Sequence, residues 1–317
     1  MENRHDTVLL NEAVDGLEIA PGDVVVDGTI GGGGHLELMH QKLGSGGVLI
    51  GIDADKDAIV RAEAKVRSKP GPRVVLANDN FRNIGRVLDD AGVEALDKAL
   101  FDLGWSSFHL ESGRGFSFKA HEPLLMTYGS PEEGETAAEL LSSATEEELA
   151  DILYTYGEER FSRSIARTLV RVRKEAPILT TDDLVRVVEE STPIWYHHRR
   201  LHPATKTFQA LRIAVNDELG ALREGLTTAM DRLAATGRIA VITFHSIEDR
   251  IVKSMFRDAA HAGKGSLVNR KPIVPTPEEI ERNPRARSAK LRIFSATPKE
   301  SSYLAATIIA PAALSYL

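Results

Sequence analysis

Four short apolar runs in the first third of the chain constrain its fold more than any other feature. They end at Asp27, Asp53, Asn78 and Asp102, and a segment with helical periodicity separates each run from the next. Apolar runs that alternate with helices predict a parallel sheet covered by helices on both faces. We therefore expect an α/β, doubly wound (Rossmann-like) core. The predicted strands are residues 23–27, 47–53, 73–77 and 98–103, with later strands at 238–244, 267–274 and 290–297.

The strand pattern is interrupted in the middle of the chain. Between residues 112 and 204 no run predicts a strand, and capping-box sequences at Thr145 and Thr180 predict helix starts. Residues 205–235 predict one long helix that Gly237 ends, before the strands resume. We therefore expect a first part of the core at 1–111, an all-helical insertion facing the substrate at 112–204, and a second part of the core at 205–317.

The composition excludes several kinds of site. The chain has 317 residues and no cysteine, which rules out disulfides, thiolate metal sites and cysteine nucleophiles and suits a reducing compartment. No segment approaches the ~20 apolar residues of a membrane helix, and no signal-peptide pattern is present. A cytoplasmic protein without a membrane partner is expected, and neither a monomer nor a homodimer is favoured.

Positive charge is concentrated in two segments although the formal net charge is −7. Residues 160–212 hold eleven Lys and Arg against five Asp and Glu, and residues 281–292 hold five against one. Such segments are either phosphate-binding surfaces or solvated helix faces. His198 and His202 have i,i+4 spacing, but no acid lies nearby and Pro203 interrupts the segment, so no metal site is predicted. The candidate RNA-binding residues are Arg199, Arg200, His202, Lys206, Arg285, Arg287 and Lys290.

A glycine-rich loop follows the first predicted strand, with the sequence DGTIGGGGHL at 27–36. Glycines allow the backbone to approach a ligand closely. The dinucleotide pattern G-x-G-x-x-G fails in both registers, because Leu36 or Glu37 stands where its last glycine is required. The loop therefore favours S-adenosyl-L-methionine, with Asp27 near its ammonium or sulfonium charge and Asp53 on the ribose hydroxyls. A glycine turn beside an unrelated surface aspartate is the alternative.

Asp102 ends the fourth predicted strand, at the edge that faces the reacting group in doubly wound folds. For methyl transfer to an exocyclic amine, its carboxylate can accept the N–H, while in-line positioning supplies most of the acceleration. Trp105 and Phe108 follow and either stack on an extruded base or pack in the core. A structural cap is the alternative role for Asp102. His245 ends the fifth strand, but without a G-x-S-x-G motif a hydrolase is not indicated.

Motifs along nearly the whole chain resemble the ribosomal small-subunit methyltransferase H family, also called MraW. They include HDTVLLNE (5–12), DGTIGGGGHL (27–36), GIDAD (51–55), NDNF (78–81), DLGWSS (102–107), RGFSF (114–118), YGEER (156–160), HPATKTFQALRIAVNDEL (202–219), FHSIEDRIVK (244–253) and NPRARSAKLR (283–292). The resemblance implies a class I methyltransferase fold with a helical domain inserted after the fourth strand. It also implies S-adenosyl-L-methionine as cofactor, 16S rRNA of the small ribosomal subunit as partner, and methylation of N4 of a cytidine in the decoding region.

The resemblance also implies roles for residues at matching positions. The expected cofactor contacts are Gly33, Gly34 and His35 from the loop, Asp53 at the ribose, Phe81 against the adenine, Asp102 near the methionine end and the reacting amine, and His109, where the family usually has glutamine. The phosphate contacts are expected from the two basic segments.

The segment 123–129 departs from the family pattern. The family commonly has P-L-D-M-R-M-D there, whereas this chain has PLLMTYG and lacks two acids and an arginine of the expected active-site lid. Either the substrate pocket is rebuilt, or the protein is a non-catalytic or weakly active cofactor-binding ribosome-assembly factor; the intact cofactor positions favour the first. A small-molecule methyltransferase or dehydrogenase is disfavoured by the failed dinucleotide pattern and the basic insertion.

Overall fold

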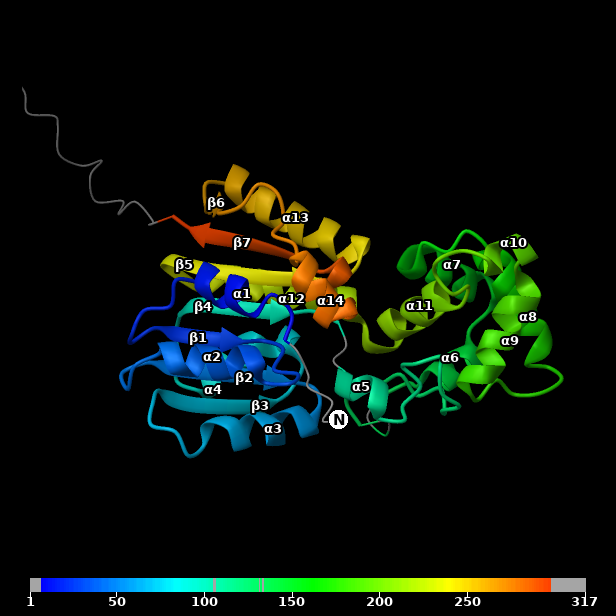
Figure 1. Cartoon of the computed structure of the whole chain (residues 1–317), viewed down its shortest axis with the longest axis horizontal. Coiled ribbons are helices and arrows are strands. Elements are labelled where there is room, and N and C mark those ends of the chain that lie inside the picture. The colour runs from blue at the N-terminus through cyan, green and yellow to red at the C-terminus, as the bar shows by residue number, and fades with distance from the viewer. Residues whose placement is uncertain (1–6, 105–106, 131, 133, 298–317) are drawn as a thin grey trace, which may run out of the picture.

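A seven-stranded sheet forms the centre of the computed structural model, which describes residues 7–104, 107–130, 132 and 134–297. The strand order is β3-β2-β1-β4-β5-β7-β6 (Figure 1). β1 to β5 run parallel, and β7 runs antiparallel to both of its neighbours. The doubly wound α/β core predicted from the strand rhythm is confirmed. The strands are β1 Val24–Asp27, β2 Val48–Asp53, β3 Arg73–Asn78, β4 Leu96–Asp102, β5 Leu233–Thr243, β6 Gly265–Leu267 and β7 Lys290–Ala296.

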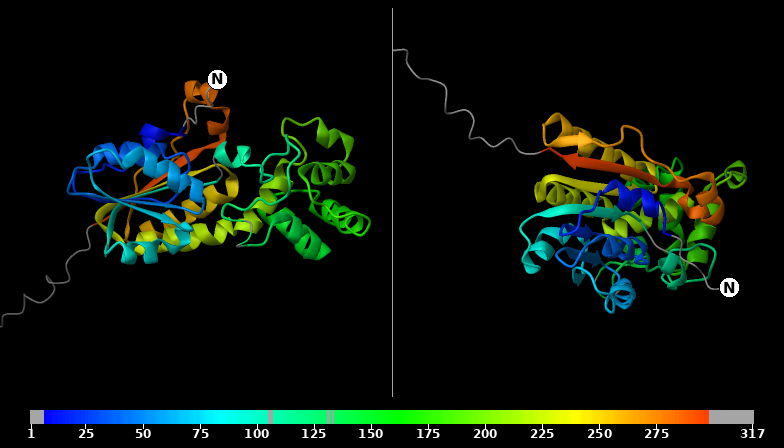
Figure 2. Two further views of the ribbon diagram at one scale, coloured as in Figure 1. Left: turned by 90° about the horizontal axis from the view of Figure 1, so that it is seen from below. Right: turned by 60° about the vertical axis from the view of Figure 1, so that its left-hand side comes forward.

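Both faces of the sheet are buried, because successive strand residues pack into two different hydrophobic clusters. Val25 and Leu100 lie in one cluster, with α1 (Leu10–Gly16), α2 (Gly34–Lys42) and α3 (Lys56–Val66). Val26 and Phe101 lie in the other, with α4 (Ile84–Asp90), α12 (Glu218–Asp231) and α13 (Ser246–His261). Figure 2 shows helices on both sides of the sheet. This arrangement explains why the parallel strands are almost continuously apolar.

A group of helices stands beyond the carboxyl edge of the sheet, and we call it the helical body (Figure 1). It contains α6 Ala137–Ser143, α7 Glu146–Gly157, α8 Ser162–Val172, α9 Thr181–Ser191, α10 Ile194–His197 and α11 Thr205–Asn216. The predicted capping boxes of Thr145 and Thr180 are confirmed. The body has its own core, which includes Phe208 and Leu211 of α11. The division at 111 and 204 stays a prediction; because α11 packs in this core, we propose that the insertion extends to Asn216.

The prediction of one helix over residues 205–235 is wrong. Asp217 adopts a left-handed conformation with φ of +43°, which ends α11 and starts α12. Its carboxylate accepts a hydrogen bond from Arg82 at 2.6 Å. The apolar pattern continues across the break because α11 packs into the core of the helical body and α12 packs into the core under the sheet. Gly237 lies within β5 and ends no helix.

The predicted strand over 267–274 is also wrong in extent. β6 ends at Leu267, and beyond it only an isolated bridge joins Ile273 to Leu291. The Asn269 side chain takes the backbone groups of β7 instead: its oxygen accepts the N–H of Ile293 at 2.9 Å, and its amide donates to the Leu291 oxygen at 3.1 Å. The short helix α5 (Ser107–Glu111) leads from β4 toward the helical body. Among the described residues, no helix combines the length and the apolar character that crossing a membrane requires.

Candidate active site

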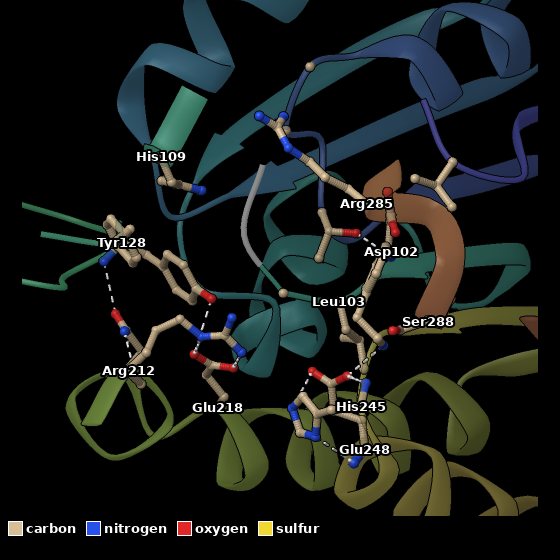
Figure 3. Close-up of a pocket in the computed structure, with 18 of the residues that line it drawn as sticks. Asp102, Leu103, His109, Tyr128, Arg212, Glu218, His245, Glu248, Arg285 and Ser288 are labelled. Carbon is tan, nitrogen blue, oxygen red and sulfur yellow. Dashed lines mark hydrogen bonds and ion pairs between the residues drawn. The ribbon is translucent and has the colours of Figure 1, made fainter. Parts of the chain in front are cut away.

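A cavity of about 870 Å³ lies at the carboxyl edge of the sheet, against the helical body. Its walls come from the loop after β1, the ends of β2 and β4, the helices α11 and α12, and the segment 282–288. Figure 3 shows Asp102, Tyr128, Arg212, Glu218 and His245 around this space. Doubly wound folds bind ligands at this edge, and the volume lies in the range of cofactor and substrate sites.

Six of the eight predicted cofactor residues line the cavity: Gly34, His35, Asp53, Phe81, Asp102 and His109. Asp27 lies behind the wall with no exposed surface. Gly33 is not a lining residue; it is the N-cap of α2 and has φ of +73°, a conformation that favours glycine. A Cβ on Gly33 would meet the Lys65 side chain at 3.2 Å, and a Cβ on Gly34 would overlap Thr7. These two glycines are therefore required by the packing of the loop itself.

Asp53 holds the glycine loop in place. Its carboxylate accepts the N–H of Gly31 at 2.8 Å and the N–H of Asp55 at 2.8 Å. Burial raises the pKa of Asp53 to about 6, although these two N–H donors oppose the rise. The loop is also tied to β4, because the Thr29 hydroxyl accepts the N–H of Asp102 at 2.5 Å. The end of β2 thus positions both an acid and the loop at the cavity wall.

Asp27 and Asp102 are two acids whose carboxylates are incompletely hydrogen-bonded. Burial raises the pKa of Asp27 to about 7, and the charge of Asp53 adds to the rise. Asp102 is 23% exposed to the cavity, and burial, then Asp27, then Glu248 raise its pKa well above its ordinary value. Asp27 Oδ2 and Asp102 Oδ1 have no hydrogen-bond partner among the described residues. A positively charged ligand would relieve this concentration of carboxylates.

Tyr128, Arg212 and Glu218 form a partly buried polar cluster on the opposite wall (Figure 3). Arg212 donates through Nε and Nη2 to the Glu218 carboxylate at 2.7 and 2.9 Å, and the Tyr128 hydroxyl donates to it at 3.1 Å. The Tyr128 ring is stacked on Phe116 with centroids 5.6 Å apart. The segment that lacks the lid charges therefore supplies an aromatic wall, anchored where α11 meets α12.

His109 is a neutral polar group in the cavity wall. Burial lowers its pKa to about 3, and the charges of Arg114, Arg61 and Arg212 contribute. Its ring is tilted against Tyr128 with centroids 5.0 Å apart. Neighbouring Phe108 packs under the Arg61 guanidinium, 4.0 Å from the ring centroid, which is a packing role. Trp105 lies outside the described residues.

Three residues have the spacing of a metal site, although the sequence predicts none. The ligand atoms of Glu218, His245 and Glu248 lie within 4.8 Å of one another. Arg212 already neutralises Glu218 through two hydrogen bonds, and Glu248 accepts the backbone N–H of Phe244 at 2.9 Å. These contacts leave a cation few free acceptors, so the site fits a metal ion poorly.

Tyr128, Arg212, Glu218, His245 and Glu248 were not predicted as individual site residues from the sequence. They come from four separate segments, so no local spacing links all five. Four of the five lie inside motifs shared with the MraW family, at 202–219 and 244–253. Those motifs were the signal that could have found them; Tyr128 instead lies in the divergent segment 123–129.

The predicted RNA-binding residues separate into two groups. Arg285 and Arg287 line the cavity on the short helix η2 (Pro284–Ser288), next to Arg282 at the end of α14 (Pro277–Arg282). They place positive charge at the edge of the space in which Asp102 lies, as Figure 3 shows for Arg285. Lys290 instead donates to Asp249 at 3.0 Å.

The other predicted RNA-binding residues belong to the helical body. Arg199 lies over the Tyr196 ring at 5.4 Å, and Arg200 is exposed. His202 is stacked on Phe118, a lining residue, with centroids 4.6 Å apart. Lys206 donates to the backbone oxygen of Glu158 at 2.6 Å. Arg199 and Arg200 do not line the cavity, so the structure does not bring the seven residues into one site.

The fold and the cavity define a doubly wound α/β protein with a ligand site at the carboxyl edge of its sheet. The family model described as MraW methylase family matches residues 2–297, and the chain belongs to that family. "Ribosomal RNA small subunit methyltransferase H" of Brevibacillus brevis is 45% identical over 305 residues, covering 91% of this chain and 96% of the relative. The protein of the same name from Heliobacterium mobile is 44% identical, covering 92% and 99%.

The solved structures that match this chain are more distant in sequence. An rRNA methylase from Streptococcus thermophilus has 11% identity and a TM-score of 0.44, covering 94% of this chain and 99% of that chain. An N-methyltransferase from Bradyrhizobium japonicum in complex with S-adenosyl-L-homocysteine has 9% identity and a TM-score of 0.40, covering 91% and 83%.

Proposed function

We propose that this protein transfers a methyl group from S-adenosyl-L-methionine to N4 of a cytidine in the decoding region of small-subunit rRNA. Membership of the MraW methylase family and the names of the relatives support an rRNA methyltransferase. The observation that carries the proposal is Asp102: its carboxylate lines the cavity at the end of β4, with 23% of the side chain exposed. An amine hydrogen is the kind of donor that a carboxylate accepts.

The residues of the cavity fit the proposed cofactor. When bound, S-adenosyl-L-methionine supplies an electrophilic methyl group on a sulfonium. Asp53 would accept hydrogen bonds from the ribose hydroxyls, and Phe81 would lie against the adenine. Asp102 and His35 would lie near the methionine end, with the negative charge of Asp27 behind them. The loop from Gly28 to Gly34 contains no Lys or Arg, which suits a cofactor without phosphate groups.

Asp102 is proposed to orient the acceptor amine. The amine is a weak nucleophile because its lone pair is delocalised into the ring, and an N–H···O bond to Asp102 would hold it in line with the methyl group. A cation bound in the cavity would lower the raised pKa of Asp102 and keep its carboxylate ionised. Transfer would form the N–C bond as the C–S bond of the cofactor breaks, and Asp102 would accept the proton that the amine then loses.

The segment 282–288 is proposed to bind the RNA backbone. Arg285 and Arg287 line the cavity, so phosphates held there would set the register of the chain beside Asp102. Such contacts carry no sequence information by themselves. The choice of cytidine must therefore come from groups inside the cavity.

Transfer of a labelled methyl group to isolated small subunits tests the proposal. We expect wild-type protein to label 16S rRNA at N4 of one cytidine, located by mass spectrometry, and Asp102→Ala to lower kcat at least a hundredfold. Asp102→Asn, which keeps the shape of the side chain, is the matched control for folding. Binding of S-adenosyl-L-homocysteine without any transfer by the wild type would instead support the non-catalytic assembly factor.

A further inference from the structure

The short helix α10 exposes two large apolar side chains at the surface of the helical body. Ile194 is 75% exposed and Trp195 is 52% exposed. Tyr196 is buried and anchors the helix, because its hydroxyl donates to the buried carboxylate of Glu159 at 2.6 Å. Successive residues of a helix point in different directions, so the burial of Tyr196 leaves Trp195 turned outward. Large apolar side chains that gather on a surface are typical of an interaction site.

Two arginines lie over the aromatic rings of this region. The Arg160 guanidinium is 5.3 Å from the ring centroid of Trp195 and 5.2 Å from that of Phe161. The Arg199 guanidinium is 5.4 Å from the ring centroid of Tyr196. The three rings contact one another, with centroids 5.0, 5.8 and 5.9 Å apart. One aromatic cluster therefore carries both guanidinium groups. We call Arg160, Trp195 and Arg199 the aromatic–arginine surface.

The positive charge of this surface is not neutralised by acids. Within the described residues, Arg160, Arg199 and the adjacent Arg200 are exposed, and no carboxylate forms an ion pair with them. By contrast, Arg171 of the same helical body pairs with Glu190. The chain as a whole has a formal net charge of −7, so this concentration of cations is local. It would attract an anionic partner to the aromatic rings.

The aromatic–arginine surface is connected to the cavity through His202. The His202 ring is stacked on Phe118 with centroids 4.6 Å apart, and Phe118 lines the cavity. Consecutive Cα atoms are about 3.8 Å apart, so the Cα of Arg199 lies at most ~11 Å from that of His202. Lys119 also lines the cavity and adds an exposed positive charge next to Phe118. A strand whose target base enters the cavity can therefore reach this surface within a few nucleotides.

We infer that the aromatic–arginine surface binds an unpaired nucleotide of the substrate RNA beside the target cytidine. Its base would stack on Trp195, and Arg160 and Arg199 would hold the adjoining phosphates. The inference rests on the proposed function and adds an RNA contact away from the reacting atoms. Enzymes that modify a base act on single strands or extrude the base from its stack, which leaves stacking partners beside the target open.

The chemistry of the surface favours RNA over a protein partner. Unpaired bases stack on aromatic side chains and on guanidinium planes, and this stacking tolerates any base. Phosphates supply the negative charge that the arginines lack within the described residues. A contact of this kind would strengthen binding and fix the path of the strand, while the groups inside the cavity select the base that reacts.

Binding of labelled oligoribonucleotides to the whole protein tests this inference. One has the decoding-region sequence, and the other has the same sequence with abasic nucleotides flanking the target cytidine. Trp195→Ala removes the stacking ring and Trp195→Phe keeps one; Leu179→Ala is the matched control, because Leu179, just before α9, is also 52% exposed. Arg160→Ala combined with Arg199→Ala removes the cations, and Arg171→Ala is the matched control. The readouts are Kd at several salt concentrations, KM for small subunits, and Tm.

We expect Trp195→Ala to weaken binding of the intact oligoribonucleotide about tenfold and of the abasic one about twofold or less. Trp195→Phe and Leu179→Ala should bind both like the wild type. The Arg160→Ala and Arg199→Ala double variant should lower the slope of log Kd against log salt concentration by about 1.4, as expected for two phosphates of a single strand. Arg171→Ala should leave this slope unchanged.

Two results would overturn the inference and leave the proposed function standing. One is wild-type affinity of Trp195→Ala for the intact oligoribonucleotide; a raised KM for small subunits would then indicate a protein contact. The other is an equal loss of affinity for both oligoribonucleotides. If Trp195→Ala fails to fold, the arginine double variant decides, since an unchanged salt slope refutes the phosphate contacts. Absence of methyl transfer to small subunits by the wild type would overturn the proposed function, whereas the binding measurements alone decide the inference.

Discussion

The carboxylate of Asp27 should make the free protein less stable as the pH rises, and Asp27→Asn should remove this effect. Asp27 has no exposed surface, and within the described residues its Oδ1 accepts a single hydrogen bond, from the N–H of Thr29 at 3.2 Å. Burial raises its pKa from 3.8 to about 7, with a contribution from Asp53. The folded state therefore binds the Asp27 proton more tightly than the unfolded state does. The contribution of this proton to the free energy of unfolding is fully present below pH 4 and is lost as the pH rises to about 7.

The size of the effect follows from the two pKa values. The difference between about 7 and 3.8 corresponds to about 4 kcal/mol of the free energy of unfolding, lost in full above pH 7. At pH 5 only about 1.5 kcal/mol of this loss has occurred. The stability of Asp27→Asn relative to wild type should therefore rise by about 3 kcal/mol between pH 5 and pH 8. For a chain of this length that is about 5 °C in Tm.

Thermal unfolding of the cofactor-free protein at pH 5 and pH 8 measures this difference. Asparagine keeps the acceptor for Thr29, and any cost of burying its amide group is the same at both pH values and cancels. Asp57→Asn is the control, because Asp57 is exposed at the start of α3. The reasoning is refuted if the Tm difference between Asp27→Asn and wild type is equal at the two pH values.

Three further outcomes are expected. Gly33→Val places a branched side chain at φ of +73° against Lys65; we predict lost binding of S-adenosyl-L-homocysteine with the fold largely kept, and calorimetry showing normal affinity would contradict this. His109→Gln should bind that ligand within about threefold of wild type, because His109 is held neutral, whereas His109→Arg should bind at least tenfold more weakly. Arg285→Ala combined with Arg287→Ala should raise KM for the RNA without changing kcat. The slope of log KM against log salt concentration should fall by the amount expected for about two phosphate contacts, and an unchanged slope would exclude phosphate binding there.

The core of the fold could be predicted from the periodicity of the apolar residues and from the helix-capping sequences. β1 to β4 were predicted from their apolar runs, and the helix starts at Thr145 and Thr180 from their capping boxes. The polar residues that end these strands were predicted to share one edge, and Asp53 and Asp102 do line one cavity. These features are encoded within a few residues, because a buried strand or a capped helix depends mainly on its own side chains and their spacing.

Features that depend on which segments meet were not predictable in the same way. The apolar pattern over 205–235 is continuous, and only the packing of its two halves into different cores reveals the break at Asp217. Tyr128 binds Glu218 across 90 positions, so no local pattern indicates the contact.

The glycine loop could be predicted only in part. Its position at the ligand edge and the preference for S-adenosyl-L-methionine over a dinucleotide were predicted from the sequence, because that preference depends only on the spacing of the glycines. The tertiary structure decided why Gly33 and Gly34 are glycines, since a left-handed φ and the approach of Thr7 arise only when distant segments pack around the loop. It also brought the ends of β4 and β5 to one edge of the sheet, because these neighbouring parallel strands pair Asp102 with Ile242, 140 positions further along the chain.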